Sequence, residues 1–253
     1  MIYPDSHFHL LSLKERGVTL DPNSNLSGID IGTTASDWEE RKALIEQFDI
    51  HYSLGCGPWC TNKEESIYNQ QATLETYVKS LKPVAIGEIG LDYYWDYGDK
   101  KTQQELFTKQ LEMANKYSLP VIIHTRDADE DTAKILSDYK VEKGGIMHCF
   151  SSHSLDFANL AISKGFYISF SGNVTFKNNK ELQEVARCIP LDKILAETDS
   201  PYLAPTPMRG RINMPEYVKY VYAFLAQLKG VDEEEFRVRV ISNLEEFYSR
   251  SQR

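Results

Sequence analysis

Short apolar runs rich in Val and Ile alternate with longer polar segments along the chain. Such short runs predict buried strands, and the longer segments, whose apolar positions recur at helical spacing, predict amphipathic helices. The expected strands cover residues 2–9, 26–32, 50–55, 83–90, 119–125, 144–149, 166–171 and 193–198. This alternation indicates repeated βα units around a parallel sheet.

The expected helices cover residues 36–47, 63–81, 101–117, 128–139, 154–164, 178–188, 215–228 and 232–249. Asp37 and Asp232 stand where helix N-caps belong, and Gly165 and Gly230 stand where helices should end. About eight strands are needed to close a (β/α)8 barrel. We therefore expect a single TIM-type α/β barrel domain over residues 1–253, regular or distorted, with an extra C-terminal helix.

The charge balance limits the classes of function. Lys and Arg number 28 against 37 for Asp and Glu, a net charge of -9, which argues against a protein that coats nucleic acid electrostatically. A polyanionic substrate would need a local positive source such as a bound metal. The sequence shows no signal peptide and no apolar stretch of about 18 residues, so we expect a cytoplasmic protein without membrane contact. We also expect no obligate protein partner, since none is evident from the sequence.

The four cysteines form no CxxC pair and no zinc-ribbon spacing, so we expect free, mostly buried thiols. Candidate chemistry comes instead from histidines and carboxylates near the ends of predicted strands. His7 and His9 are two residues apart in an extended segment and should point the same way. Single residues from four other strands join them: Glu88, His124, His148 and Asp199. The carboxyl ends of barrel strands converge on one pocket, so these six side chains should meet there.

Taken singly, each of these residues has a structural reading, such as a salt-bridged core Glu or a His bonded to backbone. Together they indicate a metal site, since unpaired carboxylates among apolar strand residues need a compensating charge. Four His and two carboxylates exceed one tetrahedral site, which points to two divalent ions with Glu88 as the bridge. Zn, Mn and Mg all remain open. We expect His51 to be structural and His153 to be exposed.

Several sequence blocks resemble the TatD-type metal-dependent hydrolases and nucleases, a branch of the amidohydrolase-like barrels. The blocks run along the whole chain and are DSHFHL at 5–10, GEIGLDYY at 87–94, PVIIHTR at 120–126, HCFS at 148–151, SGNVTFK at 171–177, ETDSPYLAP at 197–205 and RGRINMP at 209–215. The resemblance implies that one ion is held by His7, His9, Glu88 and Asp199. It implies that Glu88, His124 and His148 hold the second.

The same resemblance implies divalent-metal-dependent phosphodiester hydrolysis, in particular 3′-to-5′ exodeoxyribonuclease action on single-stranded ends by a metal-activated water. Glu88 and Asp199 are the expected catalytic carboxylates, with Asp199 orienting and deprotonating the water. A nucleic-acid end or a nucleotide is then the substrate. The alternatives are hydrolysis of a small amide, ester or aminoacyl bond, and a non-catalytic binding protein that kept the barrel.

Substrate contacts are expected from Arg209, Lys177 and Asn213, which follow the last two strands. Rim aromatics such as Trp95 and Tyr202 have two readings, stacking on a base or packing of the barrel rim. One position departs from the family pattern: where Gly-x-His-Pro is usual, residues 55–58 read GCGP, so Gly57 replaces a histidine. That histidine resembles a substrate or solvent contact, so we expect the metal site to persist and phosphate handling to differ, with Trp59 or Cys56 as partial substitutes.

Overall fold

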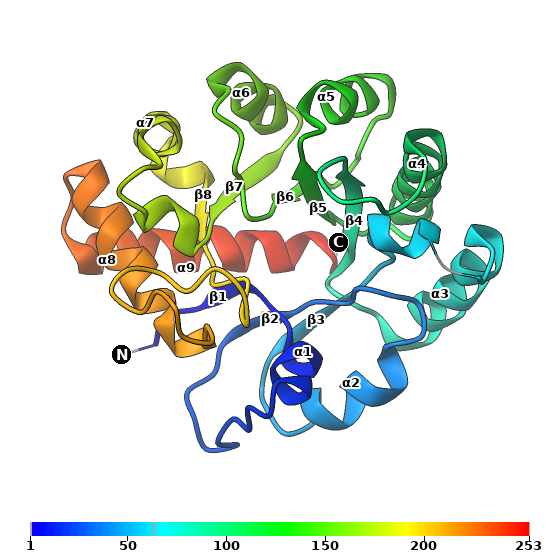
Figure 1. Ribbon diagram of the computed structural model, residues 1–253, viewed down its shortest axis with the longest axis horizontal. Coiled ribbons are helices and arrows are strands. Elements are labelled where there is room, and N and C mark those ends of the chain that lie inside the picture. The colour runs from blue at the N-terminus through cyan, green and yellow to red at the C-terminus, as the bar shows by residue number, and fades with distance from the viewer. Residues whose placement is uncertain (1, 63, 253) are drawn as a thin grey trace.

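The computed structural model describes residues 2–62 and 64–252. Eight parallel strands pair in chain order around a barrel (Figure 1). They are β1 Asp5–Phe8, β2 Gly28–Asp30, β3 His51–Leu54, β4 Ala85–Asp92, β5 Val121–Arg126, β6 Gly145–Met147, β7 Phe166–Phe170 and β8 Ile194–Ala196. The first and last strands meet through a parallel bridge between Phe8 and Ser200. A bond of 2.9 Å from the Asp199 amide to the His7 carbonyl lies beside it.

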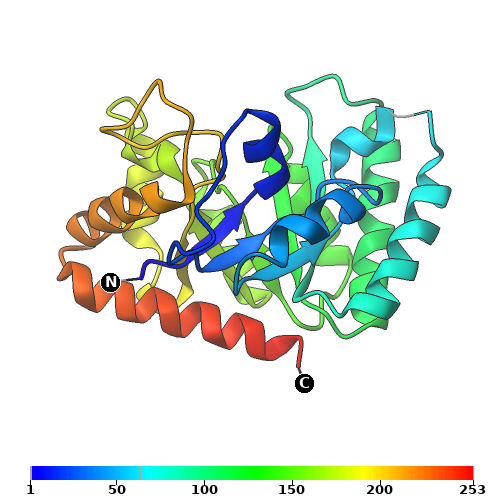
Figure 2. The same cartoon turned by 90° about the horizontal axis from the view of Figure 1, so that it is seen from below.

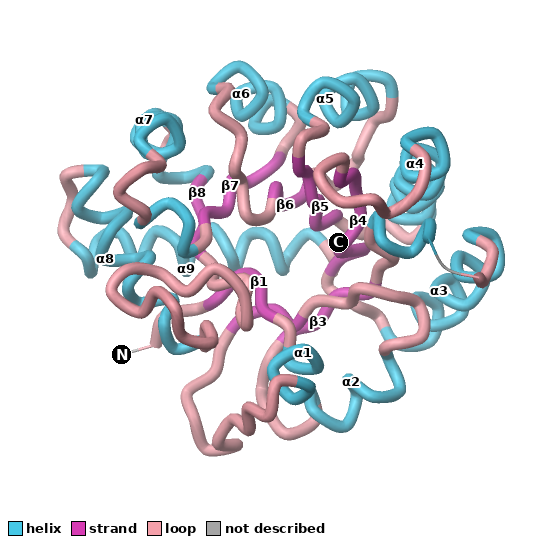
Figure 3. Tube along the Cα trace, in the orientation of Figure 1, coloured by secondary structure: helices cyan, strands magenta, loops and turns pink. Residues whose placement is uncertain are grey.

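Helices follow the strands and cover the outside of the barrel (Figure 3). They are α1 Leu10–Glu15, α2 Trp38–Ile45, α3 Ile67–Leu81, α4 Lys100–Lys116, α5 Asp129–Asp138, α6 Leu155–Ser163, α7 Lys180–Cys188, α8 Val218–Lys229 and α9 Glu233–Arg250. Short 3-10 turns are η1 Pro58–Asn62, η2 Gly172–Thr175, η3 Leu191–Lys193 and η4 Pro215–Tyr217. No helix within the described ranges has the length and apolar character needed to cross a bilayer.

The C-terminal helix α9 lies across the amino-terminal ends of the strands, and Figure 2 shows it running beneath them. The Asn243 amide donates to the carbonyl of Ile194, the first residue of β8, at 2.9 Å. The Tyr248 ring packs 3.8 Å, centroid to centroid, from the ring of His51, the first residue of β3. This end of the barrel is therefore covered, which leaves the carboxyl ends of the strands as the face where a site can open.

The predicted barrel with its extra C-terminal helix is confirmed. Most strands are shorter than expected, but β4 runs on to Asp92, two residues beyond its predicted end. The predicted helix 63–81 begins at a residue outside the described ranges and is helical from Ile67. Helix α1 was not predicted, because six residues are too few to display a helical period.

The predicted helix ends differ in their chemistry. Asp232 caps α9 by accepting from the Glu234 amide at 2.8 Å, as expected. Asp37 precedes α2, but its carboxylate does not cap that helix. It accepts from the Thr33 amide at 2.7 Å and from the Arg41 guanidinium at 3.1 Å. The Asp37 carboxylate thus binds the preceding turn and the Arg41 side chain instead of the first amides of α2.

All four thiols are free, as predicted, but only two of the four are buried. Cys56 and Cys60 are buried, Cys149 is half-buried and Cys188 is exposed.

Candidate metal centre

Four histidine rings and two carboxylates meet at the carboxyl ends of the strands. His7 lies on β1, His9 follows that strand, and His124 lies on β5. His148 follows β6, and Asp199 stands three residues beyond the end of β8. Glu88 comes from the middle of β4 and lies between the two groups of rings. The structure therefore brings together all six side chains proposed as metal ligands.

A local irregularity in β4 lets Glu88 reach this position. Ile86 pairs with Val121 and Ile89 pairs with Ile123, so three steps on β4 oppose two steps on β5. The extra residue forms a bulge, which reorients side chains at a strand that is otherwise regular. The Glu88 amide leaves the β4–β5 ladder and donates to the Gly32 carbonyl at 2.7 Å.

The first group of donor atoms surrounds one oxygen of Glu88. The Nε2 atoms of His7 and His9 lie 3.2 Å apart. They lie 3.6 Å and 3.9 Å from Glu88 Oε2. Asp199 Oδ1 completes the group at 3.7 Å from His7 Nε2 and 3.3 Å from His9 Nε2.

The second group surrounds the other oxygen of Glu88. His124 Nδ1 and His148 Nε2 each lie 2.9 Å from Glu88 Oε1. The two nitrogens are 3.3 Å from each other. Since each carboxylate oxygen faces a different set of nitrogens, Glu88 stands where a bridging ligand would stand.

These spacings fit divalent cations. Nitrogen and oxygen ligands bound to zinc at about 2.0–2.1 Å lie about 3.3 Å from one another at the corners of a tetrahedron. The donor pairs of both groups span 2.9 to 3.9 Å, around that value. The donor chemistry, imidazole with carboxylate, suits zinc and manganese and admits magnesium.

The electrostatics of the two groups show why a cation belongs there. Burial opposes ionisation of Glu88, yet the neighbouring rings of His148 and His124 outweigh it and hold the pKa of Glu88 well below its ordinary range. Burial likewise opposes the charged form of His148, but Glu88 and Glu197 raise the pKa of His148 well above its ordinary value. Within the described residues, no Lys or Arg pairs with Glu88 or Asp199. Positive charge must come from protonated imidazoles or from bound metal.

Two further carboxylates hold the rings of the second group from behind. Asp92 Oδ2 lies 3.0 Å from His124 Nε2, and Glu197 Oε1 lies 3.0 Å from His148 Nδ1. Such outer partners fix the tautomer and orientation of a ligating imidazole. Neither residue was predicted from the sequence to act at the site, although both lie in the blocks that resemble the TatD family. The available signal was a buried carboxylate at the end of a strand that already carried a ligand.

A cavity of about 580 Å³ opens above the two groups of donors. Its lining includes His9, Glu88, His124, His148 and Asp199, whereas His7 is fully buried behind them. Aromatic side chains form much of the remaining wall, and these are Trp59, Trp95, Tyr97 and Tyr202. The site thus joins a polar floor to an aromatic wall.

Comparison with known proteins identifies the family. A model of TatD related DNases matches residues 4–249. The chain belongs to the TatD family. It is 44% identical over 194 residues to the uncharacterized metal-dependent hydrolase YabD of Bacillus subtilis, covering 76% of this chain and 75% of that protein.

The TatD assignment holds across nearly the full length. YcfH of Escherichia coli K12, also an uncharacterized metal-dependent hydrolase, is 38% identical over 246 residues, covering 93% of this chain and 91% of that protein. The crystal structure of the TatD homologue YjjV from Escherichia coli K12 superposes with a TM-score of 0.88 at 28% identity, covering 98% of each chain. The predicted family is therefore confirmed, and the protein is a TatD-family metal-dependent hydrolase.

The three residues predicted to contact substrate in this TatD protein lie on the segments that follow β7 and β8. Arg209, Lys177 and Asn213 are not part of the described cavity lining. Arg209 is exposed, and its guanidinium lies 3.8 Å from the centroid of the Phe176 ring. Asn213 is fully buried, and its amide donates to the carbonyls of Thr198 and Tyr202 at 2.8 and 2.6 Å. Through these two bonds Asn213 holds the loop that follows β8.

Arg126, at the end of β5, is the arginine that does line the cavity. Its guanidinium lies 3.8 Å from the centroid of the Tyr94 ring. Arg126 lies in one of the blocks that resemble the TatD family, but no function was predicted for it from the sequence.

The remaining two histidines lie outside the TatD cavity. His51 is half-buried against α9, and burial lowers its pKa. His153 is 54% exposed in its side chain and pairs with Glu181 on α7 at 2.9 Å. Neither ring is among those that converge on Glu88.

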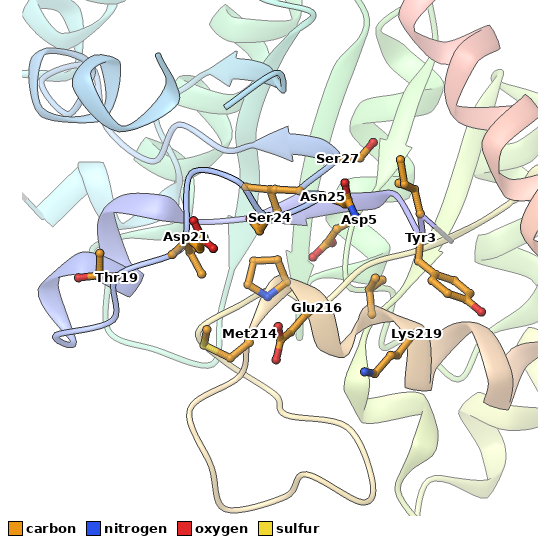
Figure 4. Close-up of a pocket in the computed structure, with 15 residues that line it drawn as sticks. Tyr3, Asp5, Thr19, Asp21, Ser24, Asn25, Ser27, Met214, Glu216 and Lys219 are labelled. Carbon is orange, nitrogen blue, oxygen red and sulfur yellow. The ribbon is translucent and has the colours of Figure 1, made fainter. Parts of the chain in front are cut away.

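A second hollow lies beside β1 and the start of α8 (Figure 4). Its volume is about 420 Å³, and its lining includes Tyr3, Asp21, Glu216 and Lys219. The described lining contains no histidine and none of the six candidate ligands, which gather around Glu88 instead.

Proposed function

We propose that this TatD-family hydrolase cleaves phosphodiester bonds and removes nucleotides from the 3′ end of single-stranded DNA. The observation that carries the proposal is the placement of Glu88, whose two oxygens face two separate groups of imidazole nitrogens on the floor of an open cavity. Paired ions bridged by one carboxylate are the arrangement that suits in-line displacement at phosphorus.

His7, His9, Glu88 and Asp199 would hold one ion, and Glu88, His124 and His148 would hold the other. When bound, divalent ions acidify water toward neutral pH and neutralise charge on phosphate oxygens. The positive charge of the ions would also offset, at the site, the net charge of -9, which otherwise repels a polyanionic substrate. Mg, Mn and Zn are the candidate ions.

Asp199 is the residue placed to accept a proton. Its side chain is 14% exposed and lines the cavity, and its Oδ1 lies 3.3 Å from His9 Nε2. Burial opposes its ionisation, but the hydrogen bond with His9 and the charges of the rings of His148 and His7 together outweigh it and hold the pKa of Asp199 below the ordinary value. An ionised carboxylate beside the reacting centre can orient a water molecule and take its proton.

The covered lower end of the barrel supports action on a chain end. The cavity opens on one face and its floor is formed by buried strands, so a terminal nucleotide can enter while the rest of the strand remains outside. Arg126 lies on the wall and can contact a phosphate through its planar guanidinium.

The test uses purified protein loaded separately with Mg²⁺, Mn²⁺ and Zn²⁺, and single-stranded oligonucleotides labelled at the 5′ or the 3′ end. Removal from the 3′ end should shorten 5′-labelled strands stepwise and release labelled mononucleotide at once from 3′-labelled strands. EDTA should stop both. Glu88→Ala and Asp199→Asn should each lower the rate by at least 1000-fold, on the order of a lost ligand or proton acceptor.

Glu181→Ala is the matched control, because Glu181 is 76% exposed in its side chain and lies outside the cavity. Full activity in either cavity variant would contradict the mechanism. Intact metal content with no cleavage of any oligonucleotide would instead point to a carbonyl substrate, such as an ester or an amide, which the same ions can polarise.

Arginine variants test which arginine contacts the phosphate, Arg126 of the cavity wall or Arg209 of the loop after β8. Arg126→Ala should raise the KM for oligonucleotides about tenfold or more, since a charge-assisted bond to phosphate is lost. Arg209→Ala should change KM by less than twofold, because Arg209 packs on Phe176 away from the cavity. The reverse order would place the phosphate path over the loop after β8.

A further inference from the structure

Gly57 and Trp59 form an interlocked pair at the cavity wall. A Cβ atom on Gly57 would lie 2.1 Å from Cζ2 and 2.4 Å from Cε2 of the Trp59 indole. The backbone of Gly57 is not in the left-handed region, so the turn itself does not demand glycine. The missing side chain therefore makes room for the indole.

The indole is held in a fixed position. Its Nε1 donates to the Thr33 carbonyl at 2.8 Å. Its ring meets the ring of His124 at 5.7 Å with an interplanar angle of 79°, and the ring of Tyr97 at 6.0 Å with an angle of 76°. Trp59 is thus an immobilised aromatic surface that touches a proposed metal ligand and remains partly open to the cavity.

The rest of the wall has the same character. Trp95 and Tyr202 are 52% and 43% exposed, although both line the cavity. Large aromatic rings left open to solvent inside a pocket are typical of surfaces that receive a planar ligand. Arg126 lies 5.7 Å from the Trp95 ring and adds a positive group to this wall.

We propose that the Trp59 indole, which occupies the space left by the missing side chain of Gly57, sets the substrate preference of this enzyme. It would do so by stacking on a planar ring of the substrate, the base next to the scissile phosphate. The inference rests on the proposed function and extends it, because it names the part of the substrate that is recognised. Packing of a base on an aromatic side chain is sequence-tolerant, since every base has a π-face. The enzyme should therefore favour nucleotides over sugar phosphates without strong preference among bases.

Binding, rather than turnover, tests this inference. Thymidine 5′-monophosphate and 2-deoxyribose 5-phosphate share a phosphate and a sugar, and neither contains a phosphodiester bond. Calorimetric titration of the metal-loaded wild type should show at least tenfold tighter binding of the nucleotide, in line with the contribution of one stacked base. Equal affinities in the wild type would overturn the proposal.

Two variants should remove the preference by different routes. Trp59→Ala deletes the indole, and Gly57→Ala displaces it while keeping it in the sequence. Each should weaken nucleotide binding about tenfold or more, leave sugar-phosphate binding within twofold and keep the metal content of the wild type. Trp59→Phe should retain part of the preference, and Tyr68→Ala, on an exposed aromatic of α3, should retain all of it.

The readouts also separate this inference from the proposed function. Preferential nucleotide binding without cleavage of any oligonucleotide would support the role of Trp59 and contradict the exonuclease. Cleavage with an unchanged binding ratio in Trp59→Ala and Gly57→Ala would overturn the inference alone. Should Trp59→Ala lose metal, Gly57→Ala decides the matter, and an unchanged binding ratio in a metal-loaded Gly57→Ala of wild-type stability would overturn the inference.

Discussion

Two clusters of buried charged residues, one around Arg41 and one around Glu88, differ in how the charge of their carboxylates is compensated. In the first, Arg41 is 1% exposed and lies between Asp30 and Asp37. Its Nη2 is 2.7 Å from Asp30 Oδ2, and its Nη1 is 3.1 Å from Asp37 Oδ1. The cluster carries its own cation, and its remaining donors reach the carbonyls of Asp30 and Ser53 at 3.1 Å.

The second cluster has carboxylates but no permanent cation. Glu88 and Asp199 face only imidazoles among the described residues, and imidazole is charged only when it is protonated. The Arg41 cluster is therefore complete once the chain has folded, whereas the Glu88 cluster is completed by what it binds. A buried carboxylate indicates a site when the chain does not supply its counter-charge.

The first cluster also supports the second. Asp30 Oδ1 accepts from the Leu10 amide at 2.8 Å, directly after His9. Ser53, whose carbonyl is bonded by Arg41, donates through Oγ to the Gly87 carbonyl at 2.7 Å, directly before Glu88. The self-neutralised cluster thus holds the backbone on which two proposed ligands stand.

The largest expected effect comes from breaking the first cluster. Arg41→Met leaves two buried carboxylates uncompensated and should lower the free energy of unfolding by about 3–5 kcal/mol. Urea denaturation monitored by circular dichroism measures this loss. Asp30→Asn in the same chain should recover part of it, because one buried charge is then removed. Arg187→Met, on an exposed pair of α7, should leave the midpoint unchanged. A stable Arg41→Met protein would show that this cluster is not needed for folding.

Metal removal is the corresponding change at the second cluster. A divalent ion that binds only the folded state adds about 2.7 kcal/mol at 100 times its Kd. For a chain of this size we expect the Tm to rise by roughly 5–10 °C on loading. Glu88→Ala should abolish most of this rise, as followed by differential scanning calorimetry with and without EDTA. An equal rise in Glu88→Ala would place the bound ion elsewhere.

The outer carboxylates should have a smaller effect. Glu197→Gln replaces the acceptor that orients His148 through Nδ1 and should weaken metal binding about 10–100-fold. Competition with a chromophoric chelator gives the affinity. Glu181→Gln is the matched variant, because Glu181 lies 2.9 Å from Nδ1 of the exposed His153, and it should bind metal as the wild type does. Equal affinities for the two variants would show that Glu197 does not tune the site.

His51 belongs to neither cluster and gives the smallest effect. Burial lowers its pKa below the ordinary value of 6.5, so the unfolded chain takes up the proton first as the pH falls. This contribution to stability is full above about pH 7 and is lost as the pH falls below 6.5. Because the ring is half-exposed, the loss should stay below about 1 kcal/mol. His51→Phe should remove this part of the loss in the free energy of unfolding between pH 7 and 5, as measured by urea denaturation at each pH. An unchanged loss in the variant would assign the pH dependence of stability to other groups.

The sequence alone placed most of the fold. Eight apolar runs predicted the eight strands, and helical periodicity predicted the helices of more than six residues, because both patterns follow from which face of a segment is buried. Short elements such as α1 and η1 were not predicted, since one or two helical turns are too short to show a periodic pattern of apolar residues. Strand ends also differed, because ladder bonds to neighbours decide where a strand stops.

The candidate ligands could be identified from the chain because residue type and strand position together imply convergence in a barrel. His7, His124 and His148 required no coordinates to be named. Substrate contacts were harder, because Asn213 and Arg209 sit in a loop whose path depends on many weak tertiary contacts. Arg126 and Trp59 could be assigned to the cavity only once that path was known.

The motifs of the chain indicated its metal-dependent hydrolase family. By itself the sequence also determined a parallel barrel and a set of six candidate metal ligands. These follow from periodicity and residue chemistry, which are local properties. Only the tertiary structure decided that each oxygen of Glu88 faces its own pair of imidazoles and that Arg41 neutralises two of the other buried carboxylates. It also decided that the Trp59 indole fills the space above Gly57. The physical reason is that bridging and neutralisation join side chains from different strands and helices, which only packing brings together. The place of the indole beside Gly57 likewise depends on its contacts with Thr33 and His124.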